Sequence, residues 1–287
     1  MKFAIATDAA HPTLDDDGPA LLEALANVGL VPTIASWTDR GVDWSSFDAV
    51  LLRTVWDYTS DLEGFLRWTR RIRRLINPGE LVAWNAEKTY LRQLADCGIP
   101  TVETQWLSPG HALSRAPFDD FVVKPAVSAG ARDTARFSGS ELEEARVLVE
   151  LIHGRAQVAM LQPYLGGIDA RGETALYYFG GHYSHAVRKP ALLERGRVVD
   201  QYAPGFVEAR TPSVSELELG EQLFDDLRSL GFDLPTYARV DLVPGGDGEP
   251  RLMELELIEP RLFLATSEGS ADRYVEAVRE ALENPPS

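Results

Sequence analysis

Residues 237–258 show the clearest alternation of apolar and polar positions in the chain, and this alternation predicts two strands joined by a loop. Segments 237–243 and 251–258 alternate in character, and a cluster of Pro, Gly and Asp at 244–250 separates them. Neighbouring side chains of a strand point to opposite faces. One predicted face is apolar, with Ala238, Val240, Leu242, Met253, Leu255 and Leu257, and the other carries Arg239, Asp241, Glu254 and Glu256 beside Leu252.

The carboxylates gathered on one face of this predicted hairpin indicate a bound cation. Like charges on paired strands destabilise a sheet, and the cost rises in a cleft because the local dielectric is low. Mg²⁺ takes oxygen ligands from one or two carboxylates and completes its shell with phosphate oxygens and water. Asp241, Glu254 and Glu256 fit this role. The alternative is an acidic face that is only solvated, with Arg239 as an ordinary ion-pair partner.

The N-terminal part of the chain alternates between strands and a helix. Strands are expected at 2–7, 31–36 and 48–54, and a helix begins near Pro19 and ends before Gly29. This order predicts an α/β layer with a parallel sheet. Ligands of such sheets bind beyond the carboxyl ends of the strands.

Residues 53–58 follow the third of these strands and are therefore candidates for substrate binding. A guanidinium binds a carboxylate through two hydrogen bonds, which suits Arg53, and the carboxylate of Asp57 suits an amine. Trp56 and Tyr58 are expected beside them. The alternative is a packed tryptophan and a surface ion pair without a ligand.

The remaining pattern predicts further helices and strands. Residues 194–212 are polar and irregular, as expected for a mobile loop. All six tryptophans lie between Trp37 and Trp106, and this shift in composition, with the loop at 107–117, predicts a domain boundary after residue 106. Pro163 and the Gly166-Gly167 pair predict a hinge between two lobes, so domains are expected at 1–106, 107–165 and 166–287. Helices are expected at 62–75, at 86–96 with Asn85 as N-cap, at 141–152, 215–230 and 270–282, and strands at 120–124, 135–137, 157–163, 174–179 and 183–188.

Three isolated lysines lie at the ends of expected elements. Lys88 falls in the first turn of helix 86–96, where the helix dipole disfavours a cation unless an anion is near. Lys124 and Lys189 each end a strand and precede a proline. Small residues at 126–134 let backbone amides approach a phosphate, although neither GxxxxGK[ST] nor GxGxxG occurs in the chain. The alternatives are exposed lysines and an ordinary connection between strands.

Composition restricts the class of function. The 287 residues carry a net charge of −16, which argues against general binding of nucleic acid phosphates. Cys97 is the only cysteine, so neither an intrachain disulfide nor a cysteine metal cluster is expected. Apolar runs are too short for a signal peptide or a membrane span, so a cytoplasmic protein without a membrane partner is expected.

The order of these features resembles that of the ATP-grasp superfamily over nearly the whole chain. The features are the lysines, the small-residue loop, a predicted hinge after Gln162, and Arg-x-Asp and Glu-x-Glu on the hairpin. The phrases LLRTVWDY, VAWNAEKTYL, VVKPAVSAGARDT, QPYL and LMELELIEP are similar to the branch that contains the cycloserine-forming O-ureidoserine cyclase. The resemblance implies the α/β class: an ATP-grasp fold of two α+β lobes that close on ATP, preceded by an N-terminal α/β domain.

The resemblance also implies ligands for individual residues. Asp241 and Glu254 would bridge Mg²⁺, and Glu256 stands where the superfamily commonly has Asn, which leaves the number of Mg²⁺ ions open. Arg239 and Lys189 are the expected catalytic residues, Arg239 through stabilisation of the transferring phosphoryl group. Expected ATP contacts are Lys88 and Lys124 at the phosphates, Ser128 and Gly130 in a covering loop that ends at Arg132, Gln162, Tyr164 and Leu165 at the adenine, and Asp169 or Glu173 at the ribose.

The implied activity is ATP-dependent activation of a carboxylate as an acyl phosphate, followed by attack of a nitrogen nucleophile. Cyclisation of an O-ureidoserine-like amino acid, a step of antibiotic biosynthesis, is the first hypothesis. An intermolecular amino-acid ligase is the second, and a nucleotide-binding regulatory module without turnover is a third from another class. The expected partner is a small amino-acid-like substrate, not nucleic acid or membrane, and a homodimer remains an open alternative.

Overall fold

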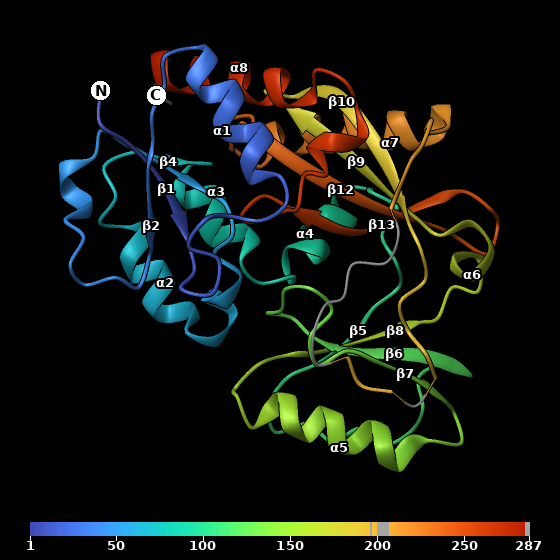
Figure 1. Ribbon diagram of the computed structural model, residues 1–287. Coiled ribbons are helices and arrows are strands. Elements are labelled where there is room, and N and C mark those ends of the chain that lie inside the picture. Colours follow the sequence, from blue (N-terminus) through green and yellow to red (C-terminus); the bar gives the residue numbers. More distant parts are fainter. Residues whose placement is uncertain (196, 200–206, 285–287) are drawn as a thin grey trace.

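The computed structural model describes residues 1–195, 197–199 and 207–284, which form three β-sheets with helices packed around them. Figure 1 shows the N-terminal sheet on one side, a small lobe with helix α5 below, and a larger lobe above. None of the helices in these ranges is long and apolar enough to cross a membrane.

The N-terminal sheet is parallel and has the order β2-β1-β3-β4. Odd residues of β1, such as Phe3 and Ile5, face α1 and α8, and even residues face an aromatic cluster that contains Trp44 and Trp68. The elements of this part are β1 (Phe3–Thr7), α1 (Gly18–Asn27), β2 (Thr33–Ser36), the 3₁₀ helix η1 (Trp44–Ser46), β3 (Ala49–Leu52), the 3₁₀ helix η2 (Trp56–Ser60), α2 (Leu62–Thr69) and β4 (Leu75–Ile76).

The small lobe is a four-stranded antiparallel sheet of order β5-β8-β6-β7. Helix α5 covers one face, against Phe121, Val123 and Leu161. Because side chains alternate along a strand, Val122, Lys124 and Gln162 lie on the opposite face. The elements are β5 (Gln105–Leu107), β6 (Asp120–Pro125), β7 (Ala135–Ser138), α5 (Leu142–His153) and β8 (Ala159–Pro163).

The large lobe is a five-stranded antiparallel sheet of order β11-β10-β9-β12-β13. Helices α3, α4 and α7 cover one face, and α1 and α8 pack on part of the other. The elements are α3 (Gly79–Asn85), α4 (Tyr90–Asp96), α6 (Gly167–Arg171), β9 (Glu173–Phe179), β10 (His182–Lys189), β11 (Glu208–Ala209), α7 (Val214–Ser229), β12 (Tyr237–Pro244), β13 (Pro250–Glu256), the 3₁₀ helix η3 (Leu264–Thr266) and α8 (Ser270–Glu283).

Two predicted helices differ from the structure. The helix predicted at 62–75 ends at Thr69, and residues 75–76 form strand β4 because they pair with β3. Asn85 ends α3 and does not cap the next helix, which begins at Tyr90. Its amide is instead bonded to β13, donating to the carbonyl of Leu255 at 2.8 Å and accepting from the amide of Leu257 at 3.0 Å.

The structure describes part of the loop predicted at 194–212 and shows how the segments around the predicted domain boundaries pack. Residues 196 and 200–206 lie outside the described residues, and β11 at 208–209 pairs with β10, which the sequence did not predict. The domain boundaries at 106/107 and 165/166 stay predictions. Residues 105–107 already belong to the sheet of the small lobe, and α3 and α4 pack on the large lobe.

A β-bulge corrects the predicted faces of the hairpin. Asp241 pairs with Glu254, but the next residue, Leu242, pairs with Leu252, so Met253 is an extra residue on β13. The register on the two sides of the bulge differs by one residue. Leu252 is therefore fully buried in the core, and Met253 lies on the side of the acids.

Buried polar contacts join the N-terminal part to the large lobe. The Asn77 amide donates to the carbonyls of Tyr237 at 2.9 Å and Leu257 at 2.8 Å, and its oxygen accepts from the Thr236 amide at 2.6 Å. Asp17 accepts backbone hydrogen bonds from residues 262–264. These contacts tie the end of β4 and the start of α1 to the large lobe.

Replacing Asn77 with Ala should lower the free energy of unfolding by about 3 kcal/mol, because several buried backbone groups would lose their partner. Urea denaturation followed by tryptophan fluorescence measures this change. The matched control is Asn27→Ala, at an exposed site in α1, where we expect a change within about 0.5 kcal/mol. Equal effects of the two variants would contradict the proposed role of Asn77.

Candidate functional site

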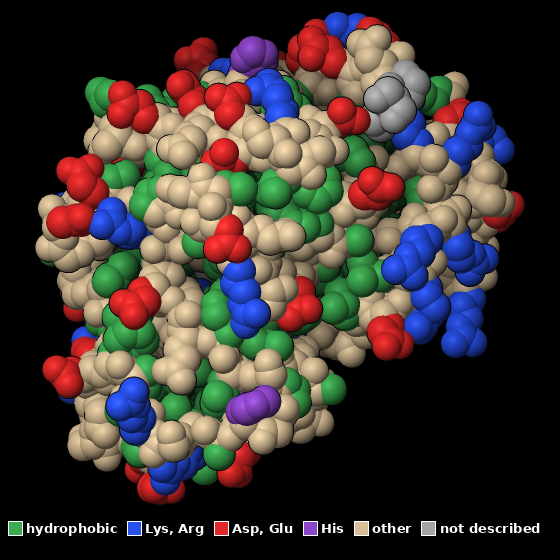
Figure 2. All heavy atoms as spheres, turned by 180° about the vertical axis from the view of Figure 1, so that it is seen from behind, with side chains coloured by type: hydrophobic (Ala, Val, Ile, Leu, Met, Phe, Trp, Pro, Cys, Tyr) green, Lys and Arg blue, Asp and Glu red, His purple; other side chains and the backbone are tan. Residues whose placement is uncertain are grey.

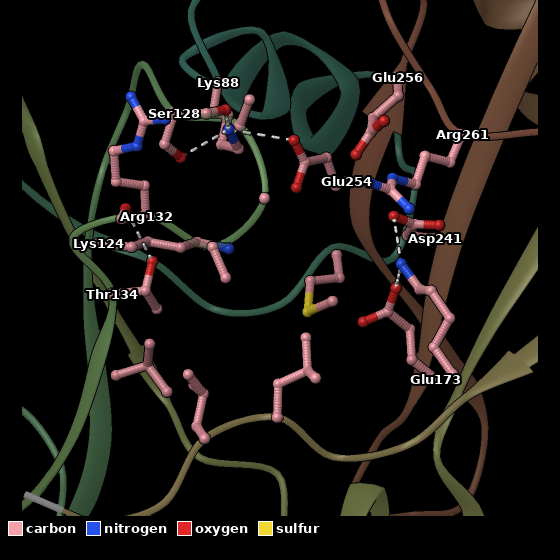
Figure 3. Close-up of a pocket in the computed structure, with 18 of the residues that line it drawn as sticks. Lys88, Lys124, Ser128, Arg132, Thr134, Glu173, Asp241, Glu254, Glu256 and Arg261 are labelled. Atoms are coloured by element: carbon pink, nitrogen blue, oxygen red, sulfur yellow. Dashed lines mark hydrogen bonds and ion pairs between the residues drawn. The ribbon is translucent and has the colours of Figure 1, made fainter. Parts of the chain in front are cut away.

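A cavity of about 680 Å³ lies between the three sheets. Its walls come from the open face of the small lobe, the acidic face of β12 and β13, and the loops that follow β1 and β3. Figure 3 shows Lys124, Thr134 and Arg132 on one side of the cavity, and Asp241, Glu254 and Glu256 on the other. The cavity therefore places cations from one lobe opposite acids from the other.

The acidic wall contains three carboxylates that could hold a metal ion. In the pairing of β12 with β13, Arg239 lies opposite Glu256, and Asp241 lies opposite Glu254. All four side chains are therefore on one face of the sheet. One oxygen each of Asp241, Glu254 and Glu256 lies within 4.8 Å of the others. Carboxylate oxygens are the donors that Mg²⁺ prefers, so the donor set fits this ion.

Cations neutralise this acidic wall. Arg239 donates to both oxygens of Asp241, at 2.9 and 2.8 Å, and to Glu256. Lys189 donates to Asp241 at 2.9 Å and forms an ion pair with Glu173. Burial alone would raise the pKa of Asp241, but the charges of Arg239 and Lys189 lower it to about 2. Asp241 is therefore ionised at neutral pH.

The neighbouring acids have pKa values near neutrality. Burial raises the pKa of Glu173 to about 7, against the opposing charge of Lys189. Burial also raises the pKa of Glu256 to about 7, against the opposing charge of Arg239. A divalent cation beside these carboxylates would favour their ionised form.

Lysines are concentrated at this cavity. The chain has four lysines, and Lys88, Lys124 and Lys189 line the cavity. Lys88 donates to the carbonyl of Ser128 at 2.8 Å and pairs with Glu254 at 3.0 Å. It lies before α4, not in the first turn of a helix as predicted, so the helix-dipole argument for an anion no longer applies.

Lys124 shows the cost of placing a cation on the buried face of β6. Its side chain is only 8% exposed. Burial lowers its pKa to about 8, although the charge of Glu254 opposes this effect. An anionic ligand in the cavity would favour the charged lysine.

The loop after β6 supplies small residues to the same wall. Ser128, Gly130 and Arg132 line the cavity. Gly130 has φ 63°, and Ala131 and Asp133 also have positive φ, so the loop turns tightly here. Without larger side chains, backbone amides of this loop can approach a phosphate closely.

Apolar side chains also line the cavity and are suited to pack against a flat ring. Gln162, Tyr164 and Leu165, which the resemblance assigned to the adenine, line the cavity together with Val122, Ile168 and Met253. Met253 reaches this wall only because of the bulge in β13. The side-chain amide of Gln162 donates to Thr104 Oγ1 at 2.9 Å.

Most of the predicted site residues meet in this cavity. Three do not line it: Arg53 and Tyr58, predicted at the substrate, and Asp169, predicted at the ribose. The predicted residues that line it are Lys88, Lys124, Ser128, Gly130, Gln162, Tyr164, Leu165, Glu173, Lys189, Arg239, Asp241, Glu254, Glu256, Trp56 and Asp57.

The side chains of Arg53 and Tyr58 are buried in the protein and do not line the cavity. Arg53 is 1% exposed, donates to the carbonyl of Pro260 at 3.0 Å, and faces Asp15 and Asp17 at 3.9 and 3.7 Å. Tyr58 is buried against Phe65. Arg53 therefore has a structural role in place of the predicted carboxylate clamp.

Asp169 lies outside the cavity because α6 carries it to the edge of Tyr164. It accepts a hydrogen bond from the Tyr164 hydroxyl and lies 4.0 Å from Arg136. Of the two residues predicted at the ribose, Glu173 is the one that lines the cavity.

Sequence reasoning missed several residues of the cavity. Asp8 and His11 follow β1 directly, so the rule that ligands bind at the carboxyl ends of parallel strands could have found them. Glu259 and Arg261 follow β13, and only the fold brings them to the cavity. The Arg261 guanidinium lies 4.7 Å from the centre of the Trp56 ring.

The reverse face of the molecule carries charges of both signs. Figure 2 shows Lys and Arg side chains gathered on the side where the N-terminal part lies. Arg70, Arg71 and Arg73, which follow α2, are exposed. These arginines lie outside the residues that line the cavity.

Comparisons with known proteins find relatives over the full chain. A family model described as the N-terminal domain of the D-cycloserine synthetase DcsG matches residues 3–77. The chain is 37% identical over 294 residues to the cycloserine biosynthesis protein DcsG of Streptomyces lavendulae, covering 98% of each.

Solved structures agree with this sequence similarity. The crystal structure of the D-cycloserine synthetase DcsG superimposes with a TM-score of 0.91 at 36% identity, over 98% of this chain and 100% of that chain. The ATP-grasp ligase PsnB, in complex with a precursor peptide and AMPPNP, has a TM-score of 0.60 at 18% identity, over 97% of each chain. At this low identity, the likeness to PsnB shows the fold alone.

Replacing Lys124 with Met should stabilise the protein by about 3 kcal/mol at pH 7, because burial lowers the pKa of this lysine from 10.5 to about 8 and so disfavours its charged form in the folded state. Both states of the wild-type protein bind this proton below pH 8. The gain should therefore be complete there, shrink between pH 8 and 10.5 as the folded lysine loses its proton, and vanish above that range.

Urea denaturation of both proteins across this pH range measures the difference. The matched control is Lys2→Met, because Lys2 is exposed and should show no pH-dependent gain. A loss of stability in Lys124→Met at pH 7 would contradict the prediction.

Proposed function

This chain belongs to the cycloserine synthetase branch of the ATP-grasp ligases, and we propose that it activates the carboxylate of a small amino-acid-like substrate with ATP and Mg²⁺. The ATP-grasp fold predicted from the sequence is confirmed, and the protein is an ATP-grasp ligase. The observation that carries the proposed chemistry is one cavity that is lined both by three of the four lysines and by three carboxylates able to hold a metal ion.

ATP enters the cavity as a substrate, with its adenine against the apolar side chains and its phosphates between the lobes. Val122, Leu165 and Met253 pack on the ring. Lys88 and Lys124 contact the phosphates, and the loop at Ser128 and Gly130 covers them. Asp241, Glu254 and Glu256 hold Mg²⁺, which neutralises phosphate charge when it is bound.

Phosphoryl transfer needs positioning and neutralisation of charge more than covalent help from the protein. An oxygen of the substrate carboxylate attacks the γ-phosphorus, the bond to the β–γ bridging oxygen breaks, and ADP leaves. Arg239 stabilises the charge on the transferring group, and Lys189 keeps Asp241 ionised and oriented. The product is an acyl phosphate. Its carbonyl carbon reacts with a nucleophile, whereas the negatively charged free carboxylate is a poor electrophile.

A nitrogen nucleophile then attacks the acyl carbon and forms the C–N bond. We favour a nucleophile within the same molecule, as in the cyclisation of O-ureidoserine, because the relative with full-length similarity takes part in cycloserine biosynthesis. An intermolecular ligation uses the same residues and is the second candidate. The substrate lies beside Trp56 and Asp57, where Asp57 pairs with an ammonium group.

Replacing Lys88 or Arg239 with Met should each lower the rate of ADP release by about 10²-fold or more, since each change removes a positive charge beside the phosphates. A coupled assay with ATP, Mg²⁺ and O-ureido-D-serine measures this rate. Removal of Mg²⁺ with a chelator should abolish it.

Lys2→Met is the control for the loss of a charge distant from the cavity, and it should retain the wild-type rate. Wild-type rates in Lys88→Met or Arg239→Met would remove these residues from the mechanism. ATP binding without ADP release for every carboxylate tested would contradict the proposed function.

Mass spectrometry of the products should separate the two candidate reactions. Incubation with ATP, Mg²⁺ and O-ureido-D-serine alone should yield a cyclised product that derives from one substrate molecule. Added hydroxylamine should divert the acyl phosphate to a hydroxamate. A product that joins two amino acids, with no cyclised product, would instead support the intermolecular ligase.

A further inference from the structure

An Asp–His pair lies in the same cavity and has no part in the phosphoryl transfer described above. Asp8 and His11 belong to the loop that follows β1, and both line the cavity. His11 Nδ1 lies 2.7 Å from Asp8 Oδ1. Asp8 is 3% exposed.

The loop holds this pair in a fixed orientation. Asp8 Oδ1 also accepts hydrogen bonds from the backbone amides of Ala10, at 3.0 Å, and His11, at 2.8 Å. The Asp8 amide donates to the carbonyl of Thr54 at 2.9 Å, which ties the loop to the end of β3. An ionised Asp8 accepts from Nδ1–H, so the lone pair of the imidazole lies on Nε2.

The pair sits where an α/β sheet most often binds a substrate. The strand order β2-β1-β3-β4 has its topological switch point between β1 and β3, and the loops after these two strands form a crevice there. The loop after β3 brings Trp56 against His11, with ring centres 4.6 Å apart and nearly perpendicular planes. The Trp56 indole donates to the carbonyl of Glu259 at 2.9 Å.

The second half of the proposed reaction releases a proton that needs an acceptor. The carboxylates of Asp241, Glu254 and Glu256 are engaged with Arg239, Lys88 and Lys189 and with the ion they are proposed to bind. Glu173 is paired with Lys189, and burial raises the pKa of the Glu259 carboxyl well above its usual range, which favours its protonated form. Asp57 already accepts a hydrogen bond from the Trp37 indole at 2.5 Å, and we assign it to the substrate ammonium. His11 is the imidazole among the described residues that line the cavity.

We propose that His11 is the general base for the attack of the nitrogen nucleophile and that Asp8 is its positioning residue. This inference rests on the proposed function. As the nitrogen forms its bond to the acyl carbon, Nε2 of His11 takes the proton from that nitrogen. The C–O bond to the phosphate then breaks, and its electron pair leaves with inorganic phosphate, so charge and protons balance. The imidazolium returns its proton to water.

The test compares two nucleophiles for the same acyl phosphate. Hydroxylamine attacks as a free amine and does not need a protein base, whereas the nitrogen of O-ureido-D-serine does. In His11→Gln, formation of the cyclised product should fall by about 10²-fold or more, and hydroxamate formation should change by less than about 3-fold. Asp8→Asn should lower cyclisation by about 10-fold with the same selectivity, because it loses the carboxylate that orients Nδ1.

His111→Gln is the matched control, since His111 is exposed and outside the cavity, and it should change neither rate. An equal loss of both products in His11→Gln would assign His11 to substrate binding or folding and overturn the proposal. Unchanged cyclisation would also overturn it. If the wild-type protein releases no ADP with any carboxylate, the proposed ligase activity itself is wrong. If it releases ADP but His11→Gln gives one of the contradicting results above, only the role of His11 is wrong.

A measurement without turnover addresses the geometry directly. ¹⁵N NMR of the wild-type protein should show the His11 tautomer with a proton on Nδ1, and Asp8→Asn should change the signals of both ring nitrogens. A proton on Nε2 in the neutral ring would overturn the proposed role, because that nitrogen could not accept one.

Discussion

Charge compensation within one buried cavity is the constraint on which the rest of this structure depends. Asp241 is almost fully buried and stays ionised only because Arg239 and Lys189 donate to it. Removing one member of such a buried group leaves another charge uncompensated. The resulting loss of folding free energy is larger than the net stabilisation that the intact ion pair contributes. The five-stranded sheet brings these residues together from β10 and β12, so the electrostatics of the site and the topology of the large lobe are coupled.

Lysine and arginine are distributed differently in this chain, and their distribution also indicates that charge compensation is concentrated in the cavity. Arginine supplies most of the cations of this acidic chain, yet three of the four lysines line the cavity. An ammonium is a compact point charge that adjusts its pKa when buried, and a guanidinium does so far less. Lys124 has this adjustable character because burial brings its pKa to about 8. The local positive charge of these lysines thus suits the cavity for a polyanion, although the net charge of the chain is −16.

The sequence carried enough information for the fold and for much of the cavity. Strand alternation assigned Arg239 and Asp241 to one face, and Lys124, isolated at the end of its strand, marked the opposite wall. Prediction from the sequence was wrong where a contact between distant parts of the chain determines the orientation of a side chain. Arg53 points toward Pro260, more than 200 positions later, and Asn85 bonds to β13 instead of capping a helix. The local sequence pattern does not report contacts between residues that are distant in the chain. The alternation of apolar and polar residues also does not reveal a β-bulge, because one extra residue in a strand changes which face the following side chains occupy.

The bulge in β13 separates two demands on that strand. Leu252 and Leu255 must keep the size and shape that the core requires, since both are buried in it. Met253 is excluded from the ladder and from that core, so neither pairing nor packing fixes its identity. Substitution of this one side chain can therefore change the shape of the cavity wall without disturbing the strand pairing that holds the acids in place.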